Sequence, residues 1–457
     1  MSIDTAIAAL GQTLGDRLTR SKSDLALHGR SESHFAEMPP DAVAYPETTE
    51  EVASLVRICR DHGCPVIGFG TGTSLEGHTA APRGGVSVDF SRMARVLAIN
   101  PEDMDVVVQP GITREALNEE MRATGLFFPV DPGANASLGG MASTRASGTT
   151  AVRYGTMRDN VVGLEVVTSE GEIIRTGTRA RKSSAGYDLT SLFVGSEGTL
   201  GLITELTLRL HGIPEAMAAA VCAFEETAPA VQTVIETIQS AIPMARIEYL
   251  DAASIAAVNA YSDRTDPEQP HLFVEFHGAK SAVAEQALAF GEIAAGNGGA
   301  RFEWSDRAED RSALWAARHT AYYAILASRK GARAVVTDVC VPISELASAI
   351  DATIDDVAES PIPGPILGHV GDGNYHAILL IDPDAPEEKA AALALQERMV
   401  ERALAAGGTA TGEHGVGLGK LGYMEAEHGA AWGLMGEIKR ALDPGGIMNP
   451  GKLVQQN

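Results

Sequence analysis

The order of apolar and polar residues in the first half of the chain predicts alternating helices and strands. Apolar residues recur at helical spacing within residues 52–59, and this helix is expected to end near Gly63. Thr48 followed by Glu51 is a capping-box signal for its start. A buried strand, CPVIGFG, comes directly afterwards. The pattern is therefore typical of an α/β region.

Further strands and one more helix complete the first half. Thr113 is expected to cap a helix that continues through Met121 and stops at Gly125. Residues 133–201 are rich in Gly, Ala, Ser and Thr, which suggests backbone packed closely against a large ligand. The further strands are predicted in VSVDF (Val86–Phe90), DVVVQPG (Asp105–Gly111), VVGLEVV, GEIIRTG and ITELTLRL.

The sequence pattern changes near residues 213–214, where a second domain is expected to begin. Strand and helix candidates alternate after this point, as in an α+β domain built on an antiparallel sheet. Helices are expected around 231–238, over 282–294 and through Trp315; strands are expected in AAAVCAF, ARIEYL, HLFVEFHG, VVTDVCVP and around Leu367 and Ile378. The tail IKRALDPGGIMNPGK is expected to end in a loop rather than in a core element. We therefore divide the chain into residues 1–213, 214–410 and 411–457.

Composition and charge narrow the class of protein. The 457 residues are too many for one ordinary domain, and 45% hydrophobic with 21% charged residues is typical of a soluble globular chain. The net charge of −24 argues against binding to nucleic acid or to anionic lipid surfaces. The same charge would repel a carboxylate substrate. Such a substrate must therefore meet local positive charge from Arg, Lys or a metal.

Cysteine usage and the N-terminal stretch bear on location. The cysteines show no metal-type spacing and are expected to be reduced, buried thiols: Cys59, Cys64, Cys222 and Cys340. The first residues include Asp4 and Asp16, and no basic residues lead into a long apolar run. We therefore expect neither a signal peptide nor a transmembrane helix in this stretch. We expect a cytoplasmic protein, with peripheral association with the inner membrane as the alternative.

A glycine-rich turn, GFGTGTSLEG, follows the first buried strand. Glycines let backbone N–H groups converge on a phosphate, and the hydroxyls of Thr71, Thr73 and Ser74 add donors. Leu75 stands where the Rossmann fingerprint needs a glycine, and no Lys-Ser/Thr follows as in a Walker loop. A tight turn without a ligand remains the alternative at this point.

Two glycine-rich segments carry candidate metal ligands. In GHVGDGNYH, Asp372–Gly373 is a turn signal that can bring His369 and His376 together. TGEHGVGLGK carries Glu413 and His414 between glycines. Two imidazoles and one carboxylate suit Zn, Mn or Fe(II) and leave coordination positions open. Histidines that are simply hydrogen-bonded loop residues are the alternative.

Three further motifs resemble those of a known family: PVDPGANASLGGMASTRASGT (129–149), RYGTMRDNV (153–161) and FVGSEGTLGLIT (193–204). With the glycine-rich turn they resemble, in order and over essentially the whole chain, the FAD-linked 2-hydroxy acid dehydrogenases of the vanillyl-alcohol oxidase flavoprotein family. The resemblance implies an α+β protein. Its two-part FAD-binding domain would occupy residues 1–213, its α+β cap domain with an antiparallel sheet would carry the substrate and metal ligands, and residues 411–457 would close the site and return to the FAD domain.

The resemblance implies FAD as cofactor. Some relatives attach the flavin covalently, but the motif around His78 does not match theirs, so we expect non-covalent FAD. The residues that the resemblance assigns to FAD are Gly70, Thr71, Gly72, Thr73, Ser74, Leu75, Pro132, Gly133, Ser137, Gly139, Gly140, Ser143, Gly148, Tyr154, Gly195, Glu197, Gly198, Ile203 and Asn449.

The two histidine segments look like the metal-binding motifs of D-lactate dehydrogenases, glycolate oxidase flavin subunits and D-2-hydroxyglutarate dehydrogenases. The resemblance implies that His369, His376 and Glu413 hold a divalent metal, Zn or Mn. It also implies that His414 is the general base, which takes the substrate hydroxyl proton while hydride passes from C2 to the flavin.

Substrate selection is expected from one helix and two strand positions. LWAARHTAYY places Arg318 and Tyr322 on one helical face. Arg318 alone would be a surface cation, but the resemblance implies that it grips the substrate carboxylate, and we place both residues with the candidate catalytic groups. Relatives that act on dicarboxylates carry a basic residue near Thr337 and a polar one at Ile378. A small D-2-hydroxy monocarboxylate is therefore expected, D-lactate first, then 2-hydroxybutyrate or glycolate.

The remaining expectations concern partners and alternatives. Lys420 is a weaker site candidate, near the site by resemblance but equally readable as a surface residue. The electron acceptor is expected to be cytochrome c, a quinone or an electron-transfer flavoprotein, and a homodimer is one expected assembly. The alternatives are the flavin subunit of a glycolate oxidase complex, a D-2-hydroxyglutarate dehydrogenase, a flavin-free metallohydrolase and a non-catalytic binding protein of the same fold.

Overall fold

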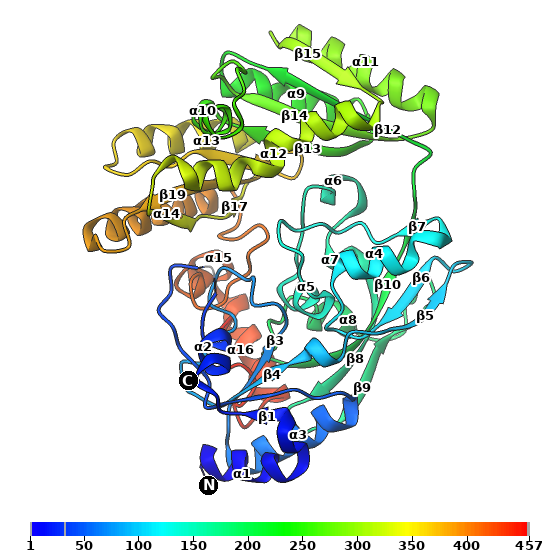
Figure 1. Ribbon diagram of the computed structural model, residues 1–457, viewed down its shortest axis with the longest axis vertical. Coiled ribbons are helices and arrows are strands. Elements are labelled where there is room, and N and C mark those ends of the chain that lie inside the picture. The colour runs from blue at the N-terminus through cyan, green and yellow to red at the C-terminus, as the bar shows by residue number, and fades with distance from the viewer. Residues whose placement is uncertain (1, 32, 455–457) are drawn as a thin grey trace. The chain divides into compact units, whose positions relative to one another are not determined.

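The computed structural model describes residues 2–31 and 33–454. The chain forms two compact units, coloured along the sequence in Figure 1. Unit 1 consists of residues 1–148, 155–213 and 413–457, and unit 2 consists of residues 149–154 and 214–412.

Unit 1 contains two main sheets. The first is a mixed four-stranded sheet in the order β1-β2-β4-β3: β1 Leu18–Thr19, β2 Ala42–Ala44, β3 Val66–Phe69 and β4 Val86–Asp89. The second is antiparallel, in the order β5-β6-β10-β8-β9: β5 Val96–Asn100, β6 Asp105–Val108, β8 Val161–Thr168, β9 Ile173–Gly177 and β10 Gly201–Arg209. A small pair joins β7 Leu126–Phe127 to β11 His211–Gly212.

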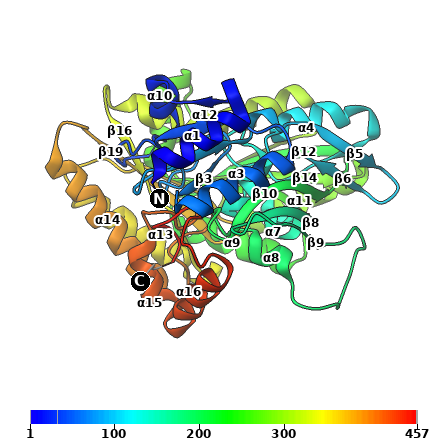
Figure 2. The same ribbon diagram turned by 90° about the horizontal axis from the view of Figure 1, so that it is seen from below.

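The helices of unit 1 are mostly short: α1 Ile3–Leu14, α2 Lys22–His28, α3 Thr49–His62, α4 Arg114–Met121, α5 Leu138–Thr144, α7 Met157–Asn160, α8 Leu189–Phe193, α15 Met424–His428 and α16 Ala430–Leu442. Between β9 and α8 the chain forms an exposed loop that extends away from the sheet (Figure 2).

Helix α3 shows how the local sequence sets the bounds of an element. The Thr48 hydroxyl accepts a hydrogen bond from the Glu51 N–H, as the capping signal predicts. The Glu51 carboxylate does not return a bond to Thr48; it pairs with the Arg17 guanidinium and accepts a hydrogen bond from the Glu47 N–H at 2.8 Å. The predicted capping box is therefore only half formed. Gly63 ends the helix in the left-handed region at φ +62°.

The C-terminal tail is a core element, which corrects our expectation of a loop. Ile447 and Met448 are buried in the same apolar cluster as α1 and α3. The Asn449 N–H donates to the Val66 carbonyl, and Met448 forms a parallel bridge with Val66. The tail thus extends the first sheet beside β3. Ile447 and Met448 stand alone between Gly446 and Asn449–Pro450, and two consecutive apolar residues are too short a run to predict a strand.

Unit 2 is built on one eight-stranded antiparallel sheet in the order β15-β12-β14-β13-β18-β19-β16, with β17 also paired to β19. Its strands are β12 Ala216–Ala223, β13 Met244–Leu250, β14 His271–Gly278, β15 Ala300–Ser305, β16 Arg333–Val336, β17 Val339–Cys340, β18 Ile366–His369 and β19 Asn374–Ile381. Its helices are α6 Ala151–Tyr154, α9 Thr227–Gln239, α10 Ala252–Ser262, α11 Lys280–Gly296, α12 Ala308–Ser328, α13 Ile343–Ala358 and α14 Pro386–Ala405.

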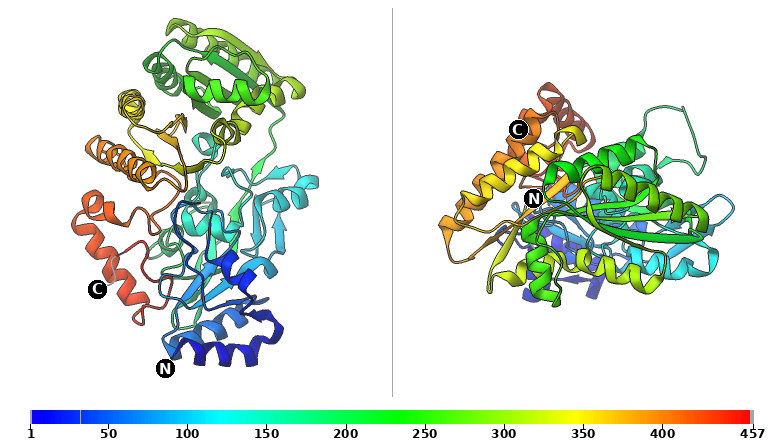
Figure 3. Two further views of the ribbon diagram at one scale, coloured as in Figure 1. Left: turned by 60° about the vertical axis from the view of Figure 1, so that its left-hand side comes forward. Right: turned by 90° about the horizontal axis from the view of Figure 1, so that it is seen from above.

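Helices lie on both faces of this sheet (Figure 3). On one face, the Tyr249 hydroxyl bonds to α9 and the Tyr375 hydroxyl bonds to α13. On the opposite face, α10 and α12 cover a buried apolar cluster whose members include Ala219, Leu250, Phe273, Trp315, Leu367, Ile378 and Leu380. Because side chains alternate between faces along each strand, the residues two positions from Leu250, Phe273 and Leu367 share this second face.

Two further predictions from the sequence, on the cysteines and on membrane-spanning helices, can be compared with the structure. All four cysteines are thiols, but Cys340 is partly exposed, so the expectation of four fully buried thiols is wrong for it. Among the helices of residues 2–31 and 33–454, none combines the length and apolar character needed to cross a membrane.

Candidate functional site

The candidate metal ligands His369 and His376 lie on neighbouring strands of one hairpin. Strands β18 and β19 are antiparallel, and their register pairs Leu367 with His376, so both imidazoles project from the same sheet face. The turn between the strands requires Gly373, whose φ is +80° and whose added Cβ would meet backbone at 2.1 Å. The predicted turn is confirmed. It places the two ring centroids 5.7 Å apart.

Both imidazoles are oriented by acceptors at Nδ1. His376 Nδ1 lies 2.9 Å from the Thr337 carbonyl oxygen, and a carbonyl can only accept, so Nδ1 carries the hydrogen. His369 Nδ1 lies 2.7 Å from Glu248 Oε1. Each ring therefore presents its lone pair at Nε2. This orientation is typical of metal-binding histidines, whose other nitrogen donates to a carbonyl or a carboxylate.

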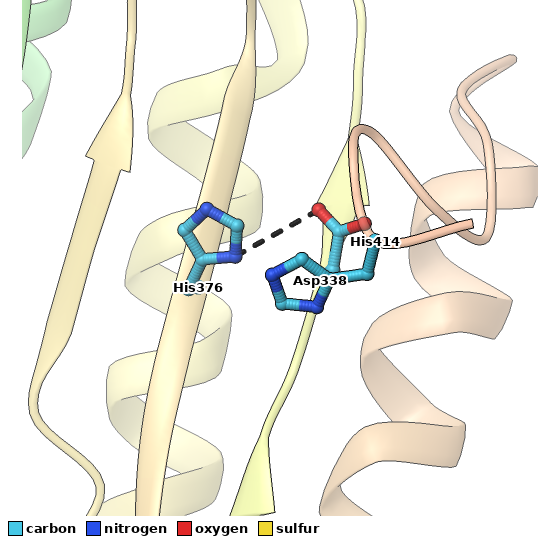
Figure 4. Close-up of side chains that lie close together, drawn as sticks. All are labelled: Asp338, His376 and His414. Atoms are coloured by element: carbon cyan, nitrogen blue, oxygen red, sulfur yellow. Dashed lines mark ion pairs between the residues drawn. The ribbon is translucent and has the colours of Figure 1, made fainter. Parts of the chain in front are cut away.

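Asp338 anchors the segment that leads out of unit 2. Its fully buried carboxylate accepts hydrogen bonds from Asn374 Nδ2 at 2.7 Å and from the Thr411 hydroxyl at 2.7 Å. His376 Nδ1 lies 3.7 Å from the same carboxylate, the pair drawn in Figure 4. An added Cβ on Gly412 would lie 2.2 Å from Asn374 Nδ2, so only glycine fits there. Thr411 and Gly412 are thereby fixed beside this strand pair.

The next two residues along the chain are Glu413 and His414. Two sets of side chains have ligand atoms within 4.8 Å of one another: His369, His376 and Glu413, and Asp338, His376 and His414. The first set is the one that the sequence predicts. Its two imidazoles and one carboxylate are a donor set that suits Zn or Mn. Asp338 belongs to the second set, but its oxygens are engaged by Asn374 and Thr411, so it acts as a support for the segment.

Arg318 lies on α12 against a buried carboxylate that the sequence analysis missed. Its Nε and Nη2 lie 2.9 Å and 2.7 Å from Glu248 Oε2. The Glu248 side chain has no exposed surface. Burial raises the pKa of Glu248, but His369 and Arg318 lower it by more, so the pKa lies below its ordinary value. Glu248 is therefore an ionised group that contacts one candidate metal ligand and the candidate substrate clamp.

A second polar group lies on the same sheet face. The Tyr154 hydroxyl lies 2.7 Å from His277 Nδ1, and His277 Nε2 lies 2.7 Å from Glu275 Oε1. Arg246 pairs with Glu275 at 3.6 Å. A signal for these residues was present in the sequence. Charged or polar residues alternate with apolar ones in ARIEYL and HLFVEFHG. This alternation indicates strands with one polar and one apolar face.

In unit 1, the glycine-rich turn and Ser137 form the candidate cradle for FAD. A Cβ added to Gly70 would lie 2.1 Å from the Ser137 hydroxyl and 3.4 Å from the Ser137 Cβ, so the turn packs directly against Ser137. The Ser137 hydroxyl is buried and, among the described residues, has no hydrogen-bond partner. An unsatisfied buried hydroxyl costs about 1–3 kcal/mol. A hydroxyl of this kind beside a glycine turn fits a bound ligand with acceptor oxygens, such as the FAD pyrophosphate.

The Glu197 side chain has its partners elsewhere in unit 1. Its carboxylate accepts hydrogen bonds from the N–H groups of Val416 and Gly417, at 2.7 Å and 2.9 Å, and lies 3.3 Å from His78 Nε2. Burial raises the pKa of Glu197, but His78 and the two N–H groups outweigh it and the pKa is lowered. Glu197 thus holds the segment that follows His414. Both of its carboxylate oxygens therefore have partners within the chain.

Four other predicted residues lie at defined places within the fold. The Asn449 amide donates to the carbonyls of His78 and Glu197, at 3.3 Å and 2.6 Å. Tyr154, predicted to contact FAD, belongs to unit 2 and its hydroxyl is engaged by His277. Lys420 is fully buried, so its interpretation as a surface residue is wrong. Tyr322 packs against the apolar cluster under α12 and is partly buried.

Replacing Ser137 with alanine should separate FAD binding from folding. We expect FAD to dissociate about 2- to 12-fold more readily, equivalent to one lost hydrogen bond of about 0.5–1.5 kcal/mol. The apoprotein should melt no earlier, because the removed hydroxyl has no partner among the described residues. The control is Ser169→Ala, which removes a buried hydroxyl that bonds the Leu442 carbonyl at 2.6 Å. That variant should lower Tm and keep FAD affinity. Unchanged FAD affinity in Ser137→Ala would contradict the cradle.

Comparison with known families defines the class of protein. Residues 40–177 match the family described as "FAD binding domain", and residues 213–453 match "FAD linked oxidases, C-terminal domain". The protein is therefore an FAD-dependent oxidoreductase. The chain belongs to the family of FAD-linked oxidases. This confirms the resemblance and the FAD cofactor, and it contradicts the flavin-free metallohydrolase.

Curated relatives cover most of the chain. It is 50% identical over 432 residues to "Probable D-lactate dehydrogenase, mitochondrial" of Danio rerio, covering 94% of this chain and 87% of that protein. It is 45% identical to the mitochondrial D-lactate dehydrogenase (cytochrome) of Arabidopsis thaliana, covering 98% of this chain and 80% of the relative. The glycolate oxidase subunit GlcD of Bacillus subtilis is 35% identical over 419 residues, or 91% of this chain and 89% of GlcD.

Solved structures share the fold at low identity. 4-Ethylphenol oxidase from Gulosibacter chungangensis aligns with a TM-score of 0.79 at 20% identity, over 98% of this chain and 96% of its own. p-Cresol methylhydroxylase aligns with the same TM-score at 17% identity and the same coverage. The predicted fold, a two-part FAD-binding domain with an α+β cap domain, is confirmed.

Proposed function

We propose that this chain oxidises a small D-2-hydroxy monocarboxylate to the 2-keto acid, with D-lactate as the first substrate and a divalent metal beside FAD. The names of the relatives at 50% and 45% identity support the substrate. The structural observation that carries the proposal is the pair of imidazoles, His369 and His376, on one sheet face with both Nδ1 atoms held by acceptors.

Each candidate residue has a distinct task. His369, His376 and Glu413 would hold the metal, since neutral imidazoles and an ionised carboxylate are available at neutral pH. When bound, FAD supplies the two-electron acceptor and a divalent cation supplies positive charge that lowers the pKa of a coordinated hydroxyl.

The chain itself would manage the proton and the carboxylate. His414 would take the substrate hydroxyl proton on an imidazole nitrogen, the commonest side-chain group in general base catalysis. The electron pair of the C2–H bond leaves with that hydrogen as hydride, and C2 becomes the ketone carbon. Arg318 would bind the substrate carboxylate through the N–H groups that do not face Glu248. This cation would also offset, locally, the repulsion between a substrate carboxylate and a protein of net charge −24.

The strand positions that bear on substrate size favour a short apolar tail. Ile378 is 2% exposed and lies in the apolar cluster under α12. The Thr337 hydroxyl accepts a hydrogen bond from the Ala377 N–H at 2.8 Å. Neither side chain is a cation, and a second carboxylate buried beside them would cost several kcal/mol. Lactate and 2-hydroxybutyrate therefore fit better than 2-hydroxyglutarate.

Chelation is the direct test of the metal. Dialysis against a chelator should abolish most D-lactate oxidation while the flavin absorbance stays, and Mn²⁺ or Zn²⁺ should restore the rate. The variant His376→Ala should show no restoration, because one of the predicted ligands is gone. Full activity after the metal content has fallen to a small fraction of the FAD content would contradict the metal's role.

A glycolate oxidase flavin subunit is the second candidate function, favoured by the 35% identity to the GlcD subunit. A dye-coupled screen of D- and L-2-hydroxy acids on the isolated chain distinguishes the two. Preference for D-lactate supports the first function. Preference for glycolate, or turnover only with added subunits, supports the second.

Relatives named "cytochrome" enzymes support a cytochrome as the electron acceptor, with a quinone or an electron-transfer flavoprotein as the alternatives. A net charge of −24 would favour a basic carrier protein. The cytoplasmic location and the homodimer stay predictions, and several relatives carry mitochondrial names.

A further inference from the structure

Glu248 lies in the middle of the unit 2 sheet, on the face that carries the candidate site. It belongs to β13, and its register partner on β14 is Phe273. Leu250, two residues further on, pairs with Leu367 of β18, so His369 lies directly across from Glu248. Arg318 approaches from α12, which covers the neighbouring apolar cluster. The position of Glu248 is therefore set by two strands and a helix.

Both oxygens of the Glu248 carboxylate are used. Oε1 lies 2.7 Å from His369 Nδ1, and Oε2 lies 2.9 Å from Arg318 Nε and 2.7 Å from Nη2. The Arg318 side chain is 12% exposed and that of Glu248 is 0% exposed. A carboxylate at such a place costs several kcal/mol in lost hydration, which its partners only offset. Apolar residues at such sites often give equal or greater stability. Stability alone is therefore a poor explanation for a charge at this position.

The geometry supplies another explanation. The contact at Oε1 fixes which nitrogen of His369 carries hydrogen and where its lone pair points. The contact at Oε2 fixes the plane of the Arg318 guanidinium. One rigid carboxylate thus sets the spacing between a candidate metal ligand and a candidate carboxylate clamp.

We propose that Glu248 is a positioning residue that holds His369 and Arg318 at the separation required by a substrate whose hydroxyl and carboxylate lie on adjacent carbons. This proposal rests on the proposed function. The hydroxyl would be met on the His369 side and the carboxylate on the Arg318 side. A 3-hydroxy acid, whose two groups are one carbon further apart, would not match both at once.

The test compares Glu248→Gln with Glu275→Gln in the FAD-loaded protein. The glutamine is nearly isosteric, but it has one acceptor oxygen where the carboxylate has two, so it cannot accept from His369 and from Arg318 at the same time. Glu275 is the matched control, because it is a buried glutamate on the adjacent strand that also contacts a histidine and an arginine. Three quantities are measured: Mn²⁺ affinity by titration of the metal-free protein, KM and kcat for D-lactate, and the rate ratio of D-lactate to D-3-hydroxybutyrate.

We expect Glu248→Gln to weaken Mn²⁺ binding about 10- to 100-fold, the usual effect of removing a group that orients a ligand. KM for D-lactate should rise, and kcat/KM should fall about 10²-fold at saturating Mn²⁺, as for a reacting group displaced by about 1 Å. The preference for D-lactate over D-3-hydroxybutyrate should shrink. Glu275→Gln should leave all three within about threefold, although both variants lose a similar buried charge.

A folded Glu248→Gln variant that keeps Mn²⁺ affinity and KM within threefold of the parent would overturn the proposal. If this variant does not fold, Glu248→Asp replaces it, because the shorter carboxylate keeps the charge but cannot reach both partners. Glu248→Asp should then lose Mn²⁺ affinity or raise KM, and parental values of both would overturn the proposal. The unsubstituted protein distinguishes failure of this inference from failure of the proposed function. If it binds no Mn²⁺ and does not oxidise D-lactate, the proposed function itself is wrong and this inference falls with it.

Discussion

Replacing His414 with alanine is expected to lower kcat for D-lactate by about 10²- to 10⁴-fold, the usual contribution of a positioned general base. FAD content should be unchanged, because the candidate cradle for FAD lies around Gly70 and Ser137. Hydrogen bonds hold the chain just before and just after His414. Thr411 is bonded to Asp338 on one side of it, and Val416 and Gly417 are bonded to Glu197 on the other.

The measurement is the rate of flavin bleaching on mixing with D-lactate, followed at several pH values. The loss should be greatest near neutral pH and smaller at high pH, where hydroxide can take the hydroxyl proton. Added imidazole should restore part of the rate, because it can fill the space that the side chain leaves. His428→Ala is the matched control, since His428 lies in the same C-terminal segment on α15. A His414→Ala variant that reduces its flavin at the parental rate would remove His414 as the base.

The sequence predicts the local parts of this molecule better than the long-range ones. The turn at Asp372–Gly373 follows from residue types in contact along the chain, and it brings His369 and His376 together as expected. The end of α3 at Gly63 is equally local. The prediction of the full capping box was wrong in one half, because the Glu51 carboxylate binds Arg17, which is distant in the sequence. Local sequence preferences cannot show that a distant side chain will compete for a capping group.

The same distinction explains the site residues that sequence reasoning missed. Glu248 contacts His369 across 121 positions and Arg318 across 70, and only the strand order β13-β18 makes the first contact possible. Glu197 was assigned to FAD through its motif, yet its carboxylate is used 219 positions later, at Val416. A motif indicates which residues belong to a site. The folded chain decides which neighbour each side chain supports.

The second large effect is expected at Arg318. Arg318→Ala should lower kcat/KM for D-lactate by about 30- to 4000-fold, which corresponds to about 2–5 kcal/mol for truncating one partner of a buried charge pair. Most of the change should appear in KM, because the carboxylate is bound both before and during hydride transfer. Arg318→Lys should be more active than Arg318→Ala but less active than the parent. Its ammonium keeps the charge but lacks the planar guanidinium that can bind Glu248 and the substrate carboxylate together.

Stability has to be measured beside activity, because Arg318 also neutralises Glu248. Removing one partner of a buried ion pair destabilises a protein by about 3–5 kcal/mol, so Arg318→Ala should melt earlier than the parent. The double variant Arg318→Ala/Glu248→Gln should recover part of that loss, while the high KM remains. Arg311→Ala is the control on the same helix, where the guanidinium bonds the Met217 carbonyl at 3.2 Å. A normal KM in folded Arg318→Ala would show that the substrate carboxylate is bound elsewhere, and the electrostatic argument from a net charge of −24 would then require another cation.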